Sequence, residues 1–220
     1  MVDANEFQKL HEQDRVYKAK STQGFRGLVL SFHGGCFTGG NTSWDVKQNM
    51  MLAELGFEVH QLAFPKTYKA FKAWACKFCW DALPQTKKVV CLGRSSGGYL
   101  ACVFAALHPS RVSQLVLLCP VLDPEMRASL LPKFQKKTKA FFGLDVAKPI
   151  ELDALVHETT CKSKKPRLLL FLAHNDANVP IEVYSLCLRK LAIFPGPRTH
   201  QGVLGCTSST LQNAIQEFVG

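Results

Sequence analysis

The sequence predicts an α/β protein with a doubly wound, mostly parallel sheet and a small helical cap. Short apolar runs, bounded by Gly, Pro or polar clusters, alternate with longer amphipathic segments, as βαβ units require. Most of the short runs are apolar on both faces, which is typical of buried parallel strands. No repeat, low-complexity segment or linker divides the 220 residues. We therefore expect a single domain spanning residues 1–220.

The predicted elements follow one another along the whole chain. Strands are expected over residues 27–32, 57–63, 88–92, 114–119, 167–173 and 191–194. Helices are expected over residues 44–55, 68–83, 96–107, 181–190 and 208–218. Ser43 suits the N-cap of the first helix, while Pro84 and Pro109 end the second and third.

One long connection, residues 120–166, separates two of the predicted strands. Connections of this length are uncommon unless they have a function. It contains a stretch, 126–142, in which Leu and Phe are mixed with four lysines, and a shorter helical stretch over 151–156. We expect a small cap over the carboxyl ends of the strands. An alternative is a membrane-surface segment that binds anionic lipid through the same residues.

Composition and cysteine content narrow the class of protein. With 47% hydrophobic and 20% charged residues, and no apolar run long enough to span a bilayer, we expect no transmembrane segment. The first fifteen residues lack the basic start and apolar centre of a secretory signal, so we expect a cytoplasmic location. The nine cysteines are an odd number, and we interpret them as reduced. Cys76 and Cys79 form a CxxC pair without a second ligand pair, which favours a helix interior over a metal site.

The formal net charge of +10 favours anionic partners. No nucleic-acid-binding motif accompanies the lysines, so we expect no specific nucleic-acid binding. A solvated basic surface is the simpler interpretation, with weak association to anionic surfaces as a further expectation.

The stretch GRSSG, residues 93–97, is the clearest motif. It has the GxSxG pattern directly after a predicted strand and before a predicted helix, which is the context of a nucleophile elbow. At such a turn the residues two before and two after the nucleophile come close together, so both should lack side chains. Ser95 has glycines at both positions, whereas Ser96 has Arg94 two residues before it. Ser95 is therefore the candidate nucleophile.

A glycine-rich loop, FHGGCFTGG over residues 32–40, follows the first predicted strand. Such a loop lets backbone N–H groups point into a site and stabilise a tetrahedral oxyanion. Gly35 and Cys36 are the expected donors, together with the backbone N–H of Ser96. A flexible turn is the structural alternative, and His33 alone would more often be structural.

A nucleophilic serine needs a base, and the base needs an orienting carboxylate. Asp176 follows the predicted strand 167–173, and His200 lies on a later loop. Asp123 also follows a strand and is the alternative acid. The three other histidines considered, His108, His157 and His174, suit helix-end, cap or strand-end positions.

Four motifs together resemble the α/β-hydrolase superfamily, and within it the hormone-sensitive-lipase-like and small carboxylesterase branch. They are HGGC (33–36), GRSSGGYLA (93–101), AHNDANVP (173–180) and GPRTHQG (196–202). The branch has HGGG before GxSAGG, so this sequence departs from it at Cys36 and Ser96. Both departures leave the backbone N–H donors in place.

The resemblance implies a serine hydrolase that cleaves a carboxylic ester through an acyl-enzyme. Ser95 would be the nucleophile, His200 the base and Asp176 the acid, in the superfamily's chain order. No metal or organic cofactor would be needed, and the substrate would be a small-molecule ester or acyl compound. Peptidase and thioesterase versions use the same groups, and a noncatalytic binding protein that uses its basic surface is the alternative of another class.

Overall fold

The structure of the protein is a computed structural model, which describes residues 12–20, 24–143, 148–155, 166–173, 175–184, 194–195, 213–214 and 217–218. Its described strands form a seven-stranded sheet in the order β1-β3-β2-β4-β5-β6-β7. The strands are β1 (Arg15–Tyr17), β2 (Gly27–Phe32), β3 (Phe57–Gln61), β4 (Val89–Arg94), β5 (Gln114–Leu118), β6 (Arg167–Leu172) and β7 (Phe194–Pro195). All pairings are parallel except that of β1 with β3. The predicted fold class is confirmed.

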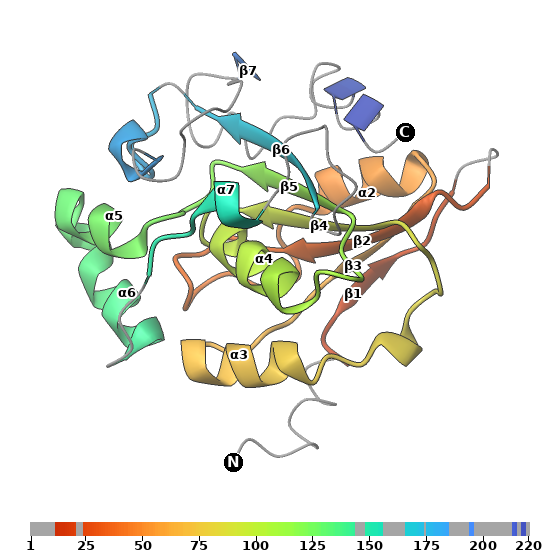
Figure 1. Cartoon of the computed structure of the whole chain (residues 1–220), viewed down its shortest axis with the longest axis horizontal. Coiled ribbons are helices and arrows are strands. Elements are labelled where there is room, and N and C mark those ends of the chain that lie inside the picture. Colours follow the sequence, from red (N-terminus) through yellow and green to blue (C-terminus); the bar gives the residue numbers. More distant parts are fainter. Residues whose placement is uncertain are drawn as a thin grey trace.

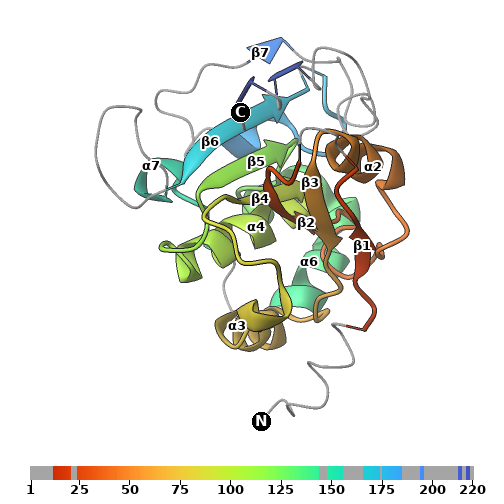
Figure 2. The same ribbon diagram turned by 90° about the vertical axis from the view of Figure 1, so that its right-hand side faces the viewer.

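Helices cover both faces of the sheet (Figures 1 and 2). On one face lies α2 (Val46–Glu54), and on the other lie α3 (Tyr68–Cys76) and α4 (Ser96–Leu107). The central strands β2, β4 and β5 are buried along their whole length. Their apolar side chains therefore divide between two cores, one beneath α2 and one beneath α3 and α4.

The long connection carries α5 (Pro124–Leu130), the 3₁₀ turn η2 (Pro132–Phe134), α6 (Gln135–Phe142) and α7 (Leu152–Leu155). Figure 1 shows α5 and α6 side by side at one end of the sheet. Phe141 and Phe142, at the end of α6, are buried and pack against Phe37 and Tyr68. Because these rings face the core, they are not available to a membrane surface. The lysines of α6 are exposed.

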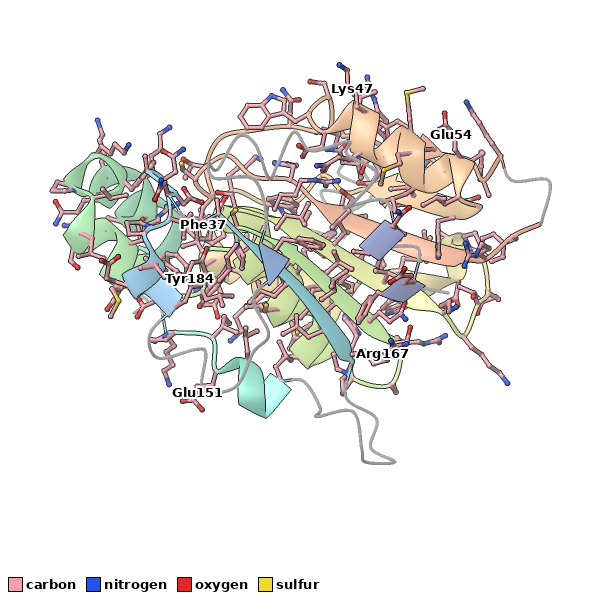
Figure 3. The ribbon with its side chains drawn as sticks, turned by 90° about the horizontal axis from the view of Figure 1, so that it is seen from above. Phe37, Lys47, Glu54, Glu151, Arg167 and Tyr184 are labelled. Carbon is pink, nitrogen blue, oxygen red and sulfur yellow. The ribbon has the colours of Figure 1, made fainter. Side chains whose placement is uncertain are left out.

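This end of the sheet is where the strands finish. Figure 3 shows Phe37 and Tyr184 there, and Arg167, the first residue of β6, at the opposite end. The 3₁₀ turn η3 (Ile181–Tyr184) packs against α5. The loops that follow β2 and β4 thus meet α5, α6 and η3 around one region.

Several predicted boundaries are wrong. The helix expected over 68–83 ends at Cys76, because Phe78 and Trp80 both pack against Phe104, with ring centroids 5.0 and 5.8 Å away. Two residues spaced by two cannot share a helix face. A separate 3₁₀ turn, η1 (Trp80–Ala82), follows, so Cys79 lies outside any helix interior.

The first helix also starts later than expected, because Ser43 is not its N-cap. The Ser43 hydroxyl donates instead to Asn41 Oδ1, and Gln61 Nε2 donates to the Trp44 carbonyl at 2.7 Å. These bonds hold the chain in turns up to Asp45, which has φ 60° and precedes the first helical residue.

At the edges of the sheet and near the C-terminus, the predicted elements match the observed ones only in part. Strand β1 was not predicted, because three residues that are mostly exposed carry no clear period. The helix expected over 181–190 begins as η3, and its remainder lies outside the described residues. Residues 213–214 and 217–218, within the last predicted helix, are helical.

Cys91, Cys102 and Cys119 are buried as thiols. Cys36, Cys76 and Cys79 are also thiols. None of the helices in the described part of the chain has the length and apolar content needed to cross a membrane.

Candidate active site

Ser95 lies at a sharp turn between β4 and α4, as predicted. Its backbone has φ 52° and ψ −122°, a region that non-glycine residues rarely adopt. The turn is held by its own backbone: the Ser95 N–H donates to the Leu118 carbonyl at 2.9 Å. The Ser95 carbonyl accepts from the N–H groups of Gly98 and Val121, both at 2.9 Å. Such strain persists only where surrounding bonds over-determine it, and this is typical of active sites.

The two flanking glycines are required by close packing. A Cβ on Gly93 would lie 2.6 Å from Gly98 Cα, and one on Gly97 would lie 2.5 Å from the His33 carbonyl oxygen. Neither approach is possible for real Cβ atoms without moving backbone. The steric reason for choosing Ser95 over Ser96 from the sequence is therefore visible in the structure.

The glycine-rich loop runs past Ser95. Gly35 has φ 117° and Cys36 has φ 55°, and the Gly39 N–H donates to the Gly35 carbonyl at 2.8 Å. A Cβ on Gly35 would lie 2.6 Å from the backbone nitrogen of Gly40, so the loop closes only with glycine there. The loop thus brings its backbone to within side-chain distance of the elbow: a Cβ on Gly34 would lie 3.3 Å from Ser95 Cβ.

Ser96 is the first residue of α4. The first N–H groups of a helix have no partner within it and carry the positive end of its dipole. The Ser96 hydroxyl is buried and has no hydrogen-bond partner within the described part of the chain. The oxyanion role predicted for Ser96 falls to its backbone N–H, at this start of α4.

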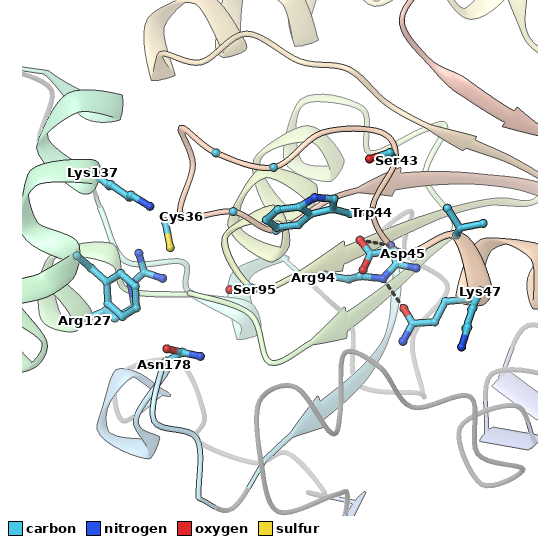
Figure 4. Close-up of a pocket in the computed structure, with 17 residues that line it drawn as sticks. Cys36, Ser43, Trp44, Asp45, Lys47, Arg94, Ser95, Arg127, Lys137 and Asn178 are labelled. Atoms are coloured by element: carbon cyan, nitrogen blue, oxygen red, sulfur yellow. Dashed lines mark hydrogen bonds and ion pairs between the residues drawn. The ribbon is translucent and has the colours of Figure 1, made fainter.

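A cavity of about 590 Å³ opens beside Ser95 (Figure 4). It brings together Ser95 and two of the three predicted oxyanion residues, Gly35 and Cys36. The other residues that line it are Gly34, Gly39, Gly40, Ser43, Trp44, Asp45, Val46, Lys47, Gln48, Arg94, Arg127, Phe134, Lys137 and Asn178. Ser96 and Asp176 are outside this lining.

Arg94, the residue between Gly93 and Ser95, lies at one end of the cavity. Its exposed fraction is 0%. Its Nε donates to Gln48 Oε1, Nη1 donates to Ser31 Oγ at 2.7 Å, and Nη2 donates to Asn49 Oδ1 at 3.1 Å. The Asp45 carboxylate lies 3.7 Å from Nη1. Burial lowers the pKa of Arg94, and the charge of Asp45 opposes that change.

Arg127, on α5, lies at the opposite end of the cavity. It is equally buried, but its guanidinium lies near the rings of Phe37 and Phe134, 5.7 and 4.3 Å from their centroids. Lys137, on α6, is exposed and lies on the same side of Ser95 in Figure 4. The sequence analysis missed both residues, because no pattern marks single basic residues of a cap as parts of a site.

Asp176 is buried in the loop after β6, close to the same region. Its Oδ1 accepts from the N–H groups of Asn178 and Val179, both at 2.8 Å, so the loop fixes the carboxylate. The alternative acid, Asp123, is used as the N-cap of α5, where its Oδ1 accepts from the Met126 N–H at 2.9 Å.

The structure describes some of the candidate histidines and not others. His200, the predicted base, lies outside the described residues, as do His157 and His174. His33 is buried, with Nδ1 2.7 Å from the Gly34 carbonyl, and burial lowers its pKa to about 4. It is therefore neutral at pH 7. His108 is half-buried, with Nε2 2.8 Å from the Ala75 carbonyl, which is a structural role rather than the surface position expected.

No group of three or more His, Cys, Asp or Glu side chains that could hold a metal ion occurs among the residues described.

Comparisons with known proteins agree with this geometry. A family model described as alpha/beta hydrolase fold matches residues 9–185. A search of curated protein sequences finds no match. The hormone-sensitive-lipase-like branch stays a prediction.

Three similar solved structures illustrate the fold. An acetyl ester-xyloside bifunctional hydrolase from Caldicellulosiruptor lactoaceticus has 18% identity and a TM-score of 0.61, with 99% of this chain and 93% of that chain covered. A Lactobacillus rhamnosis esterase B inhibited with a tributyrin phosphonate has 19% identity and a TM-score of 0.66, with 100% and 83% covered. Thermogutta terrifontis esterase 2 phosphonylated by sarin has 16% identity and a TM-score of 0.62, with 93% and 86% covered. At these identities the likeness concerns the fold. The family model, in contrast, spans most of the sequence, and the chain belongs to the alpha/beta hydrolase fold family.

Proposed function

We propose that this protein is a serine hydrolase that cleaves small carboxylic esters with a triad of Ser95, Asp176 and His200. The observation that carries the proposal is the strained turn at Ser95, which presents this residue to a cavity beside a glycine loop. Membership of the family and the esterases among its structural neighbours support the same reaction class.

The mechanism begins with attack of Ser95 Oγ on the ester carbonyl carbon, while His200 accepts the hydroxyl proton. Asp176 holds the imidazole, and its fixed position in the loop suits that role. The departing alkoxide takes the proton from His200 and leaves as an alcohol. Water then attacks the acyl-enzyme by the same route, which restores Ser95 and releases the acid.

Backbone N–H groups of Gly35, Cys36 and Ser96 would stabilise the negative charge on the carbonyl oxygen. The Ser96 N–H at the start of α4 supports this, because the helix dipole adds to the hydrogen bond. We also propose that residues 120–166 form a cap within one domain, since Arg127, Phe134 and Lys137 help to line the cavity. The six described cysteines are thiols rather than disulfides, which supports a reducing, cytoplasmic location.

Labelling with a fluorophosphonate tests this proposal. We expect covalent modification at Ser95, mapped by peptide mass spectrometry, and loss of both labelling and esterase activity by at least about a thousandfold in Ser95→Ala. Ser96→Ala is the matched control. It keeps the backbone N–H and removes a hydroxyl without a partner in the described structure, so labelling should persist.

His200→Ala should lose activity toward activated esters while the protein stays folded. Folded wild-type protein that takes no label at Ser95 would contradict the proposal. It would favour the noncatalytic binding protein.

A further inference from the structure

Arg127 is a buried cation whose donors are not satisfied. Its exposed fraction is 0%, and it lines the cavity beside Ser95. Its Nε and Nη2 are buried without a hydrogen-bond partner in the described part of the chain. It takes part in none of the ion pairs found between described residues. Buried cations are costly unless they are paired and hydrogen-bonded, so this arrangement needs an explanation.

The protein compensates for part of this cost. The Phe134 ring lies 4.3 Å and the Phe37 ring 5.7 Å from the guanidinium carbon, which are attractive cation–π distances. The face of an aromatic ring stabilises the positive charge of a guanidinium group. It accepts no hydrogen bond from the N–H groups in the guanidinium plane. The planar donors that match a carboxylate in bidentate fashion are therefore still available.

The same end of the cavity has an excess of positive charge. Lys137 lines it on the Arg127 side, and Lys133 lies close by, with Nζ 3.4 Å from Asn178 Oδ1. The carboxylate that lines the described cavity, Asp45, is at the other end, 3.7 Å from Arg94. The Asp176 carboxylate also acts on the charge of Arg127, but it lies outside the cavity lining. An anion that entered beside Arg127 would thus meet two cations within the lining itself.

We propose that the cavity binds an ester whose acyl chain ends in a carboxylate, held by Arg127 and Lys137 while the reacting carbonyl lies at Ser95. This inference rests on the proposed function, and it specifies the substrate class as monoesters of dicarboxylic acids. The carboxylate supplies the acceptor oxygens that Arg127 lacks. Its charge is attracted to Lys137 at the mouth of the cavity.

The test uses 4-nitrophenyl monoesters of succinic, glutaric and adipic acid. Each is compared with a neutral 4-nitrophenyl ester of matched chain length, so that only the charge differs. We expect at least one charged ester to exceed its neutral partner about tenfold or more in kcat/KM, chiefly through a lower KM. A charged hydrogen bond of ordinary strength accounts for that ratio.

Arg127→Met and Arg127→Lys should each lower the ratio of charged to neutral kcat/KM, Arg127→Met by about tenfold. Lys137→Gln should lower it by about threefold. Lys136→Gln is the matched control, because Lys136 is an exposed lysine of the same helix outside the cavity lining. It removes the same surface charge and should leave the ratio unchanged.

Binding of free glutarate and adipate to Ser95→Ala, measured by isothermal titration calorimetry, separates this inference from the proposed function. Binding that weakens in Ser95→Ala/Arg127→Lys supports the anion site even if no ester is hydrolysed, in which case only the proposed function fails. Hydrolysis of neutral esters as fast as charged ones, with a ratio that Arg127→Lys leaves unchanged, would overturn the anion site and leave the esterase standing. Absence of dicarboxylate binding to Ser95→Ala would overturn it as well.

Discussion

Two arginines at opposite ends of one cavity, Arg94 and Arg127, have the same burial and different surroundings. Each has an exposed fraction of 0% and lines the cavity beside Ser95. Arg94 donates to three side-chain oxygens and has the Asp45 carboxylate 3.7 Å away. Arg127 has aromatic rings as neighbours, and two of its nitrogens have no partner in the described structure.

The difference separates a structural cation from one suited to a ligand. Through Arg94, the end of β4 is joined to β2 and α2, which fixes the strand that leads into the turn at Ser95. Arg127 has no carboxylate within ion-pair distance among the described residues, and its Nε and Nη2 have no hydrogen-bond partner there, although the charge of Asp176 acts on it. Folding stability should therefore depend on the first arginine, and substrate selectivity on the second.

The largest effect is expected for Arg94→Met. This change leaves Gln48 and Asn49 with buried acceptors and Asp45 without its counter-charge, so the free energy of unfolding should fall by about 3–5 kcal/mol. Urea denaturation followed by circular dichroism measures it. A loss below about 1 kcal/mol would mean that this network does not stabilise the fold.

Acid should lower the free energy of unfolding through His33, which lies in the glycine-rich loop of residues 32–40. Burial lowers the pKa of His33 in the folded protein to about 4, from an ordinary value of 6.5. Between these values the unfolded chain binds more protons, so stability falls as the pH drops from about 6.5 to about 4. The His33 contribution to this loss should total about 3 kcal/mol.

Urea denaturation of the wild type and of His33→Asn at several pH values isolates that contribution. The difference between the two proteins should grow smaller as the pH falls through this window. A difference that stays constant with pH would show that His33 binds its proton as readily in the folded protein as in the unfolded chain, contrary to its burial.

Asp45→Asn sharpens the comparison by making the surroundings of Arg94 more like those of Arg127. The shape is kept and the counter-charge is lost, so the free energy of unfolding should fall by about 2 kcal/mol. Added salt should change this difference little, because Arg94 is fully buried and Asp45 nearly so. A difference that disappears at high salt would mean that the pair is effectively solvent-exposed.

The smallest change in stability is expected for Arg127→Met. Methionine fills a similar volume beside the two phenylalanines and removes buried donors that lack partners, so the free energy of unfolding should change by less than about 1 kcal/mol in either direction. Thermal and urea unfolding beside Arg94→Met provide the direct comparison. A loss comparable to that of Arg94→Met would show that the two arginines do not differ as described.

Elements whose residues interact over short stretches of sequence were predicted well. Helix α4, Ser96–Leu107, has the expected bounds, and so does β2, Gly27–Phe32. The turn at Ser95 follows from glycines two positions away on each side, which is a local steric requirement. Helix α3 was predicted too long, because only packing against the distant Phe104 shows why the chain leaves the helix after Cys76.

The order of residues was enough to predict the fold class and the position of the strained turn. It also shows the glycine spacing by which Ser95 differs from Ser96. These depend on periodicity and on contacts between near neighbours, which a single chain displays directly. Only the three-dimensional structure shows that Arg94 is hydrogen-bonded to three side chains and that two nitrogens of Arg127 lack partners among the described residues. Their neighbours come from segments 45 to 90 residues away or from a cap without a readable pattern. Whether a buried charge is paired depends on the groups that surround it in three dimensions. The order of residues along the chain does not show which groups those are.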